Sequence, residues 1–374
     1  MQISENTTGM SAGISVATDA QAREHCVVAV KGTFLMDGRD EPILAEVQRP
    51  VAYTDEHHGA PETTSLLREN DFALTKPLVD LLVQGHAVAP HGRATEAMLV
   101  RVETQGSQKE LRVTGDRHWA KGVMGVNPTP PKPFVRMPLR YELAFGGVDT
   151  SHPEPKHHGA ELRNPIGRGF RQNPRAADAV GTPLPNLEHP RHFLDRWDGK
   201  TVPVALGPVG RGWQPRLAHA GTYDERWLAE AFPFLPRDFN PRYFQSAPED
   251  QQLPALRGGE VFRCLGMAES GTWTVTLPRL QVPVAFRFRE SDVRAEARLD
   301  TVVLDADARE VVVTWRASVP LGKKLSHLRE VQVGLPRPSA KEGPVRYLRG
   351  KPYFRGLGAL VAWRHRTRRT GGAS

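Results

Sequence analysis

Residues 295–319 read AEARLDTVVLDADAREVVVTWRASV, which is two valine-rich runs on either side of a short polar segment. β-Branched and aromatic residues favour strands, and aspartates such as Asp305 and Asp307 favour turns. The stretch therefore predicts an antiparallel hairpin of two strands, Ala295–Leu304 and Val311–Val319.

Runs of the same kind occur upstream of this hairpin. Apolar residues alternate with threonine or arginine from Trp273 to Leu277 and from Val282 to Phe288. Two further hairpins are expected, one formed by Cys26–Met36 and Ile43–Tyr53 and one formed by Glu96–Thr104 and Glu110–Thr114 around Gly106. Gly, Pro, Asn, His and Arg dominate Asp149–Gly199, which shows no period and indicates a long loop. The pattern predicts a mainly β fold, an antiparallel sandwich or barrel-like body with long Gly/Pro-rich loops and few short helices.

The clearest alternation lies at Val135–Phe145, where every odd position is apolar. This pattern predicts one half-buried strand, placed at an edge or a bulge because Pro138 has no N–H to donate. A short helix is expected at Lys323–Val331.

Between Gly207 and Asp250 the chain concentrates aromatic residues and prolines far above its average. The prolines exclude long helices and central strands, and the rings exclude a disordered linker. One short helix fits, with Thr222 and Glu225 at capping-box spacing and an end near Phe232, before Pro233. These rings either fill a satellite core beside the sheet or contact a partner, since binding hot spots favour Trp, Tyr and Arg. The candidate partner-binding residues are Trp213, Arg216, Tyr223, Phe234, Arg237, Arg242, Tyr243 and Phe244.

Composition bounds the class of protein. The chain has 374 residues, 39% hydrophobic and 25% charged, and no apolar run long enough to span a membrane. Residues 1–24 resemble no secretion signal and are expected to be a disordered lead-in to a β-rich domain at 25–335. Cys26 and Cys264 lie in apolar runs and are expected to be buried free thiols in a reducing cytoplasm.

The net charge of +8 is unevenly distributed along the chain. From Pro344 onward there are eight basic residues and no acidic one, so the preceding part is balanced. A neutral body with a basic tail, 336–374, does not indicate a nucleic-acid-binding protein.

Motifs for catalysis are weak. There is no Gly-x-Ser-x-Gly, His-Glu-x-x-His or dinucleotide fingerprint, and Leu194 occupies the first glycine position of a phosphate loop that would end at Gly199-Lys200-Thr201. The histidines do not fall at metal-site spacing. We expect no catalytic residue, metal or cofactor.

Several long phrases identify a resemblance. In order along the chain they are GHAVAP at 85–90, TGDRHW at 114–119, MPLRYELAFGG at 137–147, NPIGRGF at 164–170, PLPNLEHP at 183–190, WQPRLAHAGTYDERW at 213–227, FPFLPRDFNPRYFQSAPEDQQ at 232–252 and LRGGE at 256–260. They resemble a bacterial family, first catalogued as a domain of unknown function, whose genes lie beside those of type VI secretion spike proteins. The resemblance covers roughly Val27–Leu335.

The resemblance implies a non-catalytic cytoplasmic adaptor or chaperone. Such a protein binds a toxic effector and helps load it onto the VgrG or PAAR spike. The family supplies no established partner-binding residues. Two alternatives remain, a structural component secreted with the spike, and an enzyme acting on a polar ligand in a loop-rich cleft, for which Asp116 and His118 are the first acid–base candidates.

Overall fold

The computed structural model describes residues 2–36, 42–123, 125–172, 175–322 and 327–334, and the backbone of β27 (Arg346–Leu348) and β28 (Lys351–Tyr353). The protein is mainly β, with 41% strand and 10% helix, and its sheets do not close into a barrel within the described residues. The mainly β prediction is confirmed, and of the two architectures expected, the barrel-like one is not seen in these ranges.

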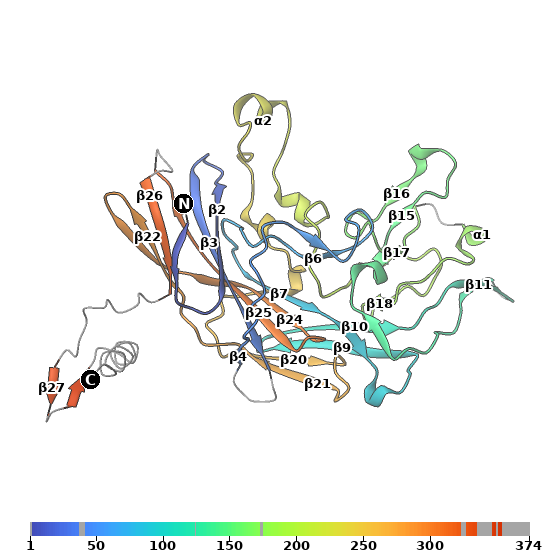
Figure 1. Cartoon of the computed structure of the whole chain (residues 1–374). Coiled ribbons are helices and arrows are strands. Elements are labelled where there is room, and N and C mark those ends of the chain that lie inside the picture. The colour runs from blue at the N-terminus through green and yellow to red at the C-terminus, as the bar shows by residue number, and fades with distance from the viewer. Residues whose placement is uncertain are drawn as a thin grey trace.

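The hairpin predicted at residues 295–319 forms the middle of the sheet that we call the central sheet (Figure 1). β24 pairs antiparallel with β25, and on its other side runs parallel to β7. Along the sheet the order is β19 (Gln252–Leu253), β7 (Val79–Gln84), β24 (Arg298–Asp305), β25 (Glu310–Pro320), β3 (Glu24–Leu35) and β2 (Ser11–Thr18), with β4 (Ile43–Leu44) paired to β3.

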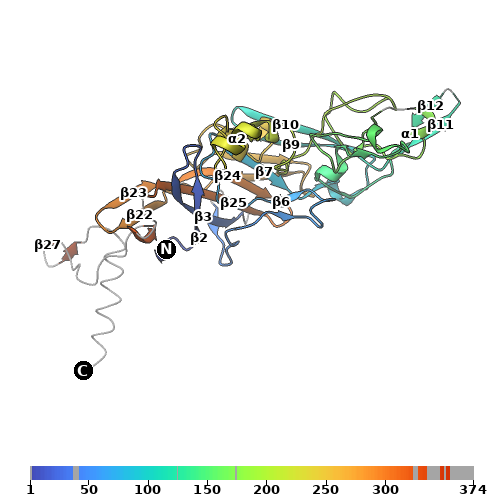
Figure 2. The same ribbon diagram turned by 90° about the horizontal axis from the view of Figure 1, so that it is seen from above.

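Two further sheets complete the framework (Figures 1 and 2). The lower sheet has the order β18 (Leu187–Glu188), β10 (Ser107–Thr114), β9 (Ala97–Thr104), β20 (Val261–Leu265) and β21 (Thr272–Thr276). The end sheet has the order β1 (Ile3–Asn6), β26 (Leu328–Val333), β22 (Pro283–Phe288) and β23 (Asp292–Glu296).

Within the described ranges, five short two-stranded pairs lie outside these three sheets, in the long connecting segments. They are β5 (Glu56–His57) with β6 (Leu66–Arg68), β8 (His86–Val88) with β13 (Arg136–Pro138), β11 (Trp119–Gly122) with β12 (Gly125–Pro128), β14 (Phe145–Gly146) with β17 (Arg168–Gly169), and β15 (Val148–Asp149) with β16 (Gly159–Ala160). The helix α1 (Ala176–Ala179) packs near β12. Trp119, Phe145 and Leu184 belong to a small separate core in this region.

Alternation along the strands places apolar side chains of all three sheets in one hydrophobic core. In β7, for example, Val79, Leu81 and Val83 enter this core, so Asp80 lies on the opposite face of the central sheet. Cys26 and Cys264 are buried free thiols, as expected, and burial raises the pKa of each to about 12.

Three expectations about local structure are corrected. Residues 1–24 were expected to be a disordered lead-in, but in the described part, residues 2–24, β1 pairs with β26 and β2 pairs with β3 along its whole length. Lys323–Val331 is not a helix where it is described: β26 occupies its second half, and a register shift against β22 breaks the alternation that would have identified a strand.

The third correction is Val135–Phe145, which is not one strand. It divides into β13, a 3-10 turn at Tyr141–Leu143 and β14. Met137, Leu139, Tyr141 and Phe145 are nevertheless buried, whereas Val135 is 43% exposed and Ala144 is buried. The alternation therefore identified most of the side chains that face the core, but not which backbone groups pair. Apart from β27 and β28, the basic tail lies outside the described residues.

Candidate interaction site

Residues 210–244 form a projection from the body that we call the arm. Its outer part, residues 221–238, is the tip and carries α2 (Glu225–Glu230), which stands above the central sheet in Figure 1 and over the sheets when seen from above in Figure 2. The arm is the proline- and aromatic-rich segment of the sequence.

The tip is held together by polar contacts at its ends and rings in its middle. Asp224 caps α2 by accepting a hydrogen bond from the backbone N–H of Trp227 at 2.8 Å. The backbone N–H and Oγ1 of Thr222 donate to the carboxylate of Asp238 at 3.0 and 2.8 Å and close the base of the tip. Thr222, expected from the sequence to cap the helix, therefore serves a different contact.

Trp227 organises the tip internally. Its Nε1 donates to the carbonyl of Phe234 at 2.9 Å. Its ring contacts those of Tyr223 and Phe232 edge to face, with centroids 4.8 and 5.5 Å apart. The tip is thus an ordered unit with its own ring packing, although it contacts little of the body.

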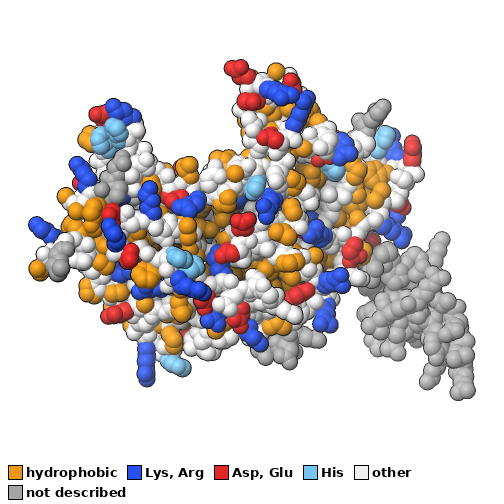
Figure 3. Space-filling view, turned by 180° about the vertical axis from the view of Figure 1, so that it is seen from behind, with side chains coloured by type: hydrophobic (Ala, Val, Ile, Leu, Met, Phe, Trp, Pro, Cys, Tyr) orange, Lys and Arg blue, Asp and Glu red, His pale blue; other side chains and the backbone are white. Residues whose placement is uncertain are grey.

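Apolar side chains nonetheless remain exposed on the tip. The exposed fractions are 54% for Tyr223, 61% for Leu228, 61% for Phe232 and 43% for Phe234. Glu225, Arg226 and Glu230 are exposed beside them, and Figure 3 shows hydrophobic and charged side chains interspersed where the arm projects above the body. Apolar residues clustered within a charged border are typical of a protein-binding surface.

The part of the arm next to the body, residues 210–220 and 239–244, is what we call the foot. Arg216 attaches the foot to the body. Its guanidinium donates to the carbonyl of Val209, just before the arm, and to that of Tyr243, near the end of the arm, with shortest distances of 2.7 and 2.9 Å. It also forms an ion pair of 2.6 Å with Glu69. Because Arg216 is only 3% exposed, this contact is structural and fixes where the arm leaves the body.

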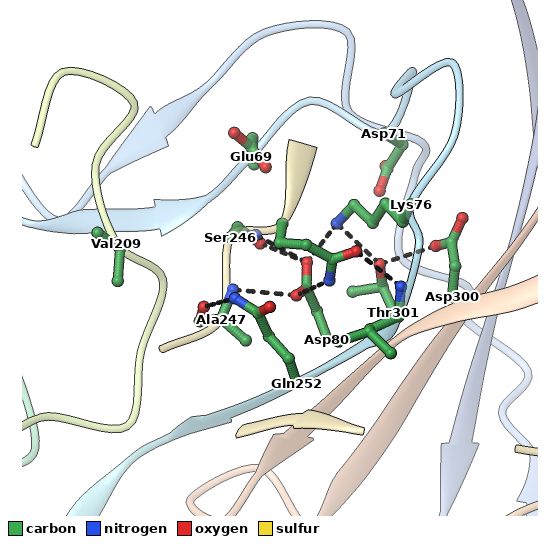
Figure 4. A network of polar contacts seen from close by, with 12 residues as sticks. Glu69, Asp71, Lys76, Asp80, Val209, Ser246, Ala247, Gln252, Asp300 and Thr301 are labelled. Carbon is green, nitrogen blue, oxygen red and sulfur yellow. Dashed lines mark hydrogen bonds and ion pairs between the residues drawn. The ribbon is translucent and has the colours of Figure 1, made fainter. Parts of the chain in front are cut away.

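A buried network around Asp80 holds the chain just after the arm (Figure 4). Asp80 is fully buried and accepts hydrogen bonds from the Gln245 side chain at 2.6 Å and from the backbone N–H groups of Ser246 and Ala247 at 2.8 and 3.2 Å. Lys76 Nζ lies 2.6 Å from Asp80 and also donates to Thr301 of β24 at 3.1 Å. The returning end of the arm is therefore tied to two strands of the central sheet.

The surroundings of Asp80 keep it ionised. Burial alone would raise the pKa of this carboxyl, but the Lys76 ammonium and the two backbone N–H groups outweigh burial and hold the pKa below its ordinary value. For Lys76 the balance differs: burial lowers the pKa of the ammonium, and the Asp80 charge offsets only part of that effect. Any other arrangement of residues 245–247 would leave the buried Asp80 carboxylate without its hydrogen bonds. The network therefore favours a single arrangement of the chain next to the arm.

The candidate residues fall into three groups. Tyr223, Phe234 and Arg237 are exposed on the tip, and Arg237 forms an ion pair with Glu230 at 3.2 Å. Arg242 is exposed at the foot, where half-buried Tyr243 and Phe244 pack with Phe239.

Trp213 packs edge to face on buried Tyr141 with centroids 5.3 Å apart, and Arg216 is buried. Sequence reasoning missed Leu228 and Phe232 as exposed residues. The exposure of Leu228 could have been predicted from helical spacing. Trp227 and Ala231 are four residues apart and occupy the inner side of α2, so Leu228 lies off that side.

The alternative acid–base candidates lie on the surface. Asp116 and His118 are both exposed, and their contacts are with Asn186 and Thr129 respectively. Within the described part of the chain, no three His, Cys, Asp or Glu side chains gather closely enough to hold a metal ion.

No helix among the described residues has both the length and the apolar character needed to cross a membrane.

Comparison with protein families gives one match, to the model described as "Uncharacterized protein conserved in bacteria (DUF2169)", over residues 21–316. Neither the curated proteins nor the solved structures contain a match. The matched range takes in the lower sheet, the whole arm and the central sheet except β2 and the last residues of β25. It leaves out β1 and β26 of the end sheet. The chain belongs to the bacterial family DUF2169.

Proposed function

We propose that this protein is a non-catalytic adaptor that binds a protein partner through the tip of the arm. The observation that carries the proposal is the exposure of Tyr223, Leu228, Phe232 and Phe234 on one ordered projection. Burying a large apolar side chain against a partner stabilises the complex by about 1.5–3 kcal/mol. An exposed group of this kind is therefore a strong candidate for a binding anchor.

Order in the free protein favours binding. The Asp224 cap, the Thr222–Asp238 contact and the Trp227 ring contacts restrict the tip before a partner arrives. The Arg216 and Asp80 contacts restrict the foot in the same way. Less conformational entropy is then lost on association, which strengthens binding without any added contact.

The partner class follows from the resemblance of the sequence to effector adaptors encoded beside VgrG and PAAR proteins. On that basis we propose that the partner is a type VI secretion effector, bound in the cytoplasm before it is loaded onto the spike. Exposed charges of both signs, including Arg226, Glu230 and Arg237, would form the polar rim of such an interface.

Affinity capture from the native bacterium tests the proposal. The full chain and a variant carrying Leu228→Ala and Phe232→Ala are tagged alike, and the captured proteins are identified and quantified. The matched control is Leu99→Ala, which removes a leucine that is 53% exposed on β9 of the lower sheet.

We expect a stoichiometric protein partner with the wild type and the control, and a loss of at least about tenfold with the tip variant. Capture that is the same for all three chains would contradict the assignment of the tip. A small-molecule conversion by the purified wild type would favour the enzymatic alternative.

A further inference from the structure

A groove of about 660 Å³ lies at the foot of the arm. One side is formed by Gln108, Lys109 and Glu110 of β10, and another by the segment 202–205. Tyr141 and Val209 contribute apolar surface, and Arg163, Arg242 and Glu249 contribute charge. The groove is open to solvent and borders the residues that fasten the arm.

Among the residues that the structure describes, about half of the outer edge of β10 has no neighbouring strand. On one side β10 pairs with β9 from Ser107 to Thr114, whereas on the other β18 pairs with it only at Arg112 and Val113. Consecutive side chains of a strand point to opposite faces, so a groove that contacts three successive residues lies along the backbone edge. The edge of β10 without a β18 partner is therefore residues 107–111, of which Gln108, Lys109 and Glu110 line the groove.

The direction of the backbone groups follows from the two-residue period of a strand. The N–H of Thr114 donates to the carbonyl of Asn186, on the β18 side. Gln108 and Glu110 are separated from Thr114 by an even number of residues. Their backbone N–H and C=O groups therefore also point toward the β18 side and away from β9. Within the described part of the chain neither residue has a backbone hydrogen bond on that side.

The wall formed by residues 202–205 is also without backbone partners among the described residues. Residues 202–205 run without regular secondary structure, and across the described ranges none of their backbone N–H or C=O groups has a hydrogen-bond partner. Val204 and Ala205 are only 8% and 1% exposed. Buried backbone groups are nearly always paired with protein, water or a ligand. The N–H and C=O groups of residues 202–205 therefore need a hydrogen-bond partner that enters the groove.

We propose that the groove binds an extended peptide segment of the protein partner by β-strand addition to β10. The inference rests on the proposed adaptor function and names a second contact beside the tip. A strand supplies N–H and C=O groups at the spacing that both walls need, which a compact small molecule does not. The free edge of β10 accommodates roughly five residues of an extended chain, about 17 Å long.

The charges around the groove also favour a peptide over an anionic ligand. Lys109 is paired with Asp250 at 2.8 Å, and Arg163 is paired with Glu161 at 2.7 Å. Arg242 lies 3.8 Å from Glu249. Since these cations already have acidic partners, backbone hydrogen bonds and the apolar surface of the groove remain to attract a ligand.

The first test uses the full wild-type chain and peptides selected on it from a random dodecamer library. Single N-methyl groups are placed along the tightest peptide, and each variant's Kd is measured by fluorescence anisotropy. Strand addition predicts losses of at least about tenfold at alternate positions within one stretch and small effects between them. Uniform sensitivity, no sensitivity, or failure to select any peptide would overturn the proposal.

Amide hydrogen exchange on the same complex locates the contact. We expect the N–H groups of Gln108 and Glu110 to exchange quickly in the free chain and to become protected by at least about tenfold when the peptide binds. The amides of Lys109 and Leu111, which face β9, serve as internal controls and should be protected throughout. Protection confined to other residues would contradict the groove assignment.

A backbone substitution links the groove to the partner itself. Gln108→Pro removes the outward N–H and leaves pairing to β9 intact, while Gln108→Ala changes the side chain and keeps the N–H. We expect Gln108→Pro to weaken partner capture and Gln108→Ala to leave it unchanged. If the tip variant loses the partner and Gln108→Pro does not, the adaptor proposal stands and the groove proposal is wrong; if neither affects capture, both are wrong.

Discussion

Arg216 shows how one residue type can suggest two roles. In the sequence it lies among aromatic residues and suggests a binding hot spot, but its guanidinium is buried against Glu69 and two backbone carbonyls. Arg242, nearby in the sequence, is exposed and suits contact with a partner. The two arginines therefore differ in what their removal should change.

Arg216→Ala should lower the free energy of unfolding by about 3 kcal/mol, because it removes one partner of a buried ion pair and leaves two carbonyls unpaired. Arg242→Ala, the matched control, should change the free energy of unfolding by less than about 0.5 kcal/mol. Urea unfolding followed by tryptophan fluorescence measures both. Equal effects of the two substitutions would show that Arg216 does not fasten the foot.

Asp80→Asn tests the buried network through its dependence on pH. The folded-state pKa of Asp80 lies below its ordinary value of about 3.9, so its ionisation stabilises the fold above that pH and the contribution is lost as pH falls through the folded pKa. The variant should lose roughly 3–5 kcal/mol at pH 7, where Lys76 becomes unpaired. The difference between wild type and variant should shrink below about pH 4.

Urea unfolding of both chains at pH 7 and pH 3 measures this difference. A gap that is the same at both values would mean that the Asp80 charge does not stabilise the folded state.

At the scale of elements, hydrophobic alternation predicted most of the framework. The hairpins β9–β10 and β24–β25 form at the expected residues, because alternating runs and polar turns determine both pairing and register. Val135–Phe145 was mispredicted as a single strand, since buried side chains can alternate across a turn and Pro138 cannot complete a ladder.

The arm could be predicted only in part. Its proline and aromatic content predicted an ordered segment with one short helix, which α2 confirms. Which rings face solvent depends on contacts distant in sequence, such as Trp213 with Tyr141, and those contacts are not visible in local pattern. Glu69, the ion-pair partner of Arg216, is 147 residues away in the sequence.

Asp224→Ala should loosen α2 without unfolding the body. Loss of an N-cap costs about 0.5–2 kcal/mol, so exchange of the Trp227 amide should become roughly 2–30-fold faster. Glu225→Ala, at a neighbouring exposed position outside the cap, is the control and should have a smaller effect. Site-resolved hydrogen exchange reports on both, and an unchanged Trp227 amide would show that the cap does not hold the tip.

For the whole molecule, the N-terminal strands are the clearest departure from expectation. Residues 1–24 contain no long apolar run, so their composition suggested disorder. β1 is stabilised by parallel pairing with β26, more than 300 residues away, and β2 by a hairpin with the next strand, β3. Met10, between β1 and β2, is 6% exposed. Tertiary pairing overrides local composition here.

Deleting residues 2–18 removes β1 and β2 and leaves the edges of β26 and β3 without a paired strand. The deletion should therefore lower the thermal midpoint strongly and promote aggregation through these edges. Deleting Arg364–Ser374 from the basic tail should leave the midpoint unchanged and weaken partner binding at low salt, because a run of cations without acidic residues mainly speeds encounter with acidic surfaces. Differential scanning calorimetry compares the two truncations. An unchanged midpoint for the first, or a large loss for the second, would contradict this view of the ends.

The central claim is that the tip of the arm is the binding surface, and isothermal titration of the captured partner tests it most directly. Kd and thermal midpoint are measured for the wild type, Phe232→Ala, Leu228→Ala and the control Leu99→Ala. Loss of a hot spot costs about 2 kcal/mol or more, so we predict a rise of roughly thirtyfold in Kd for at least one tip variant, with an unchanged midpoint. Wild-type affinity in both tip variants, or a loss of affinity explained by a lower midpoint, would contradict the claim.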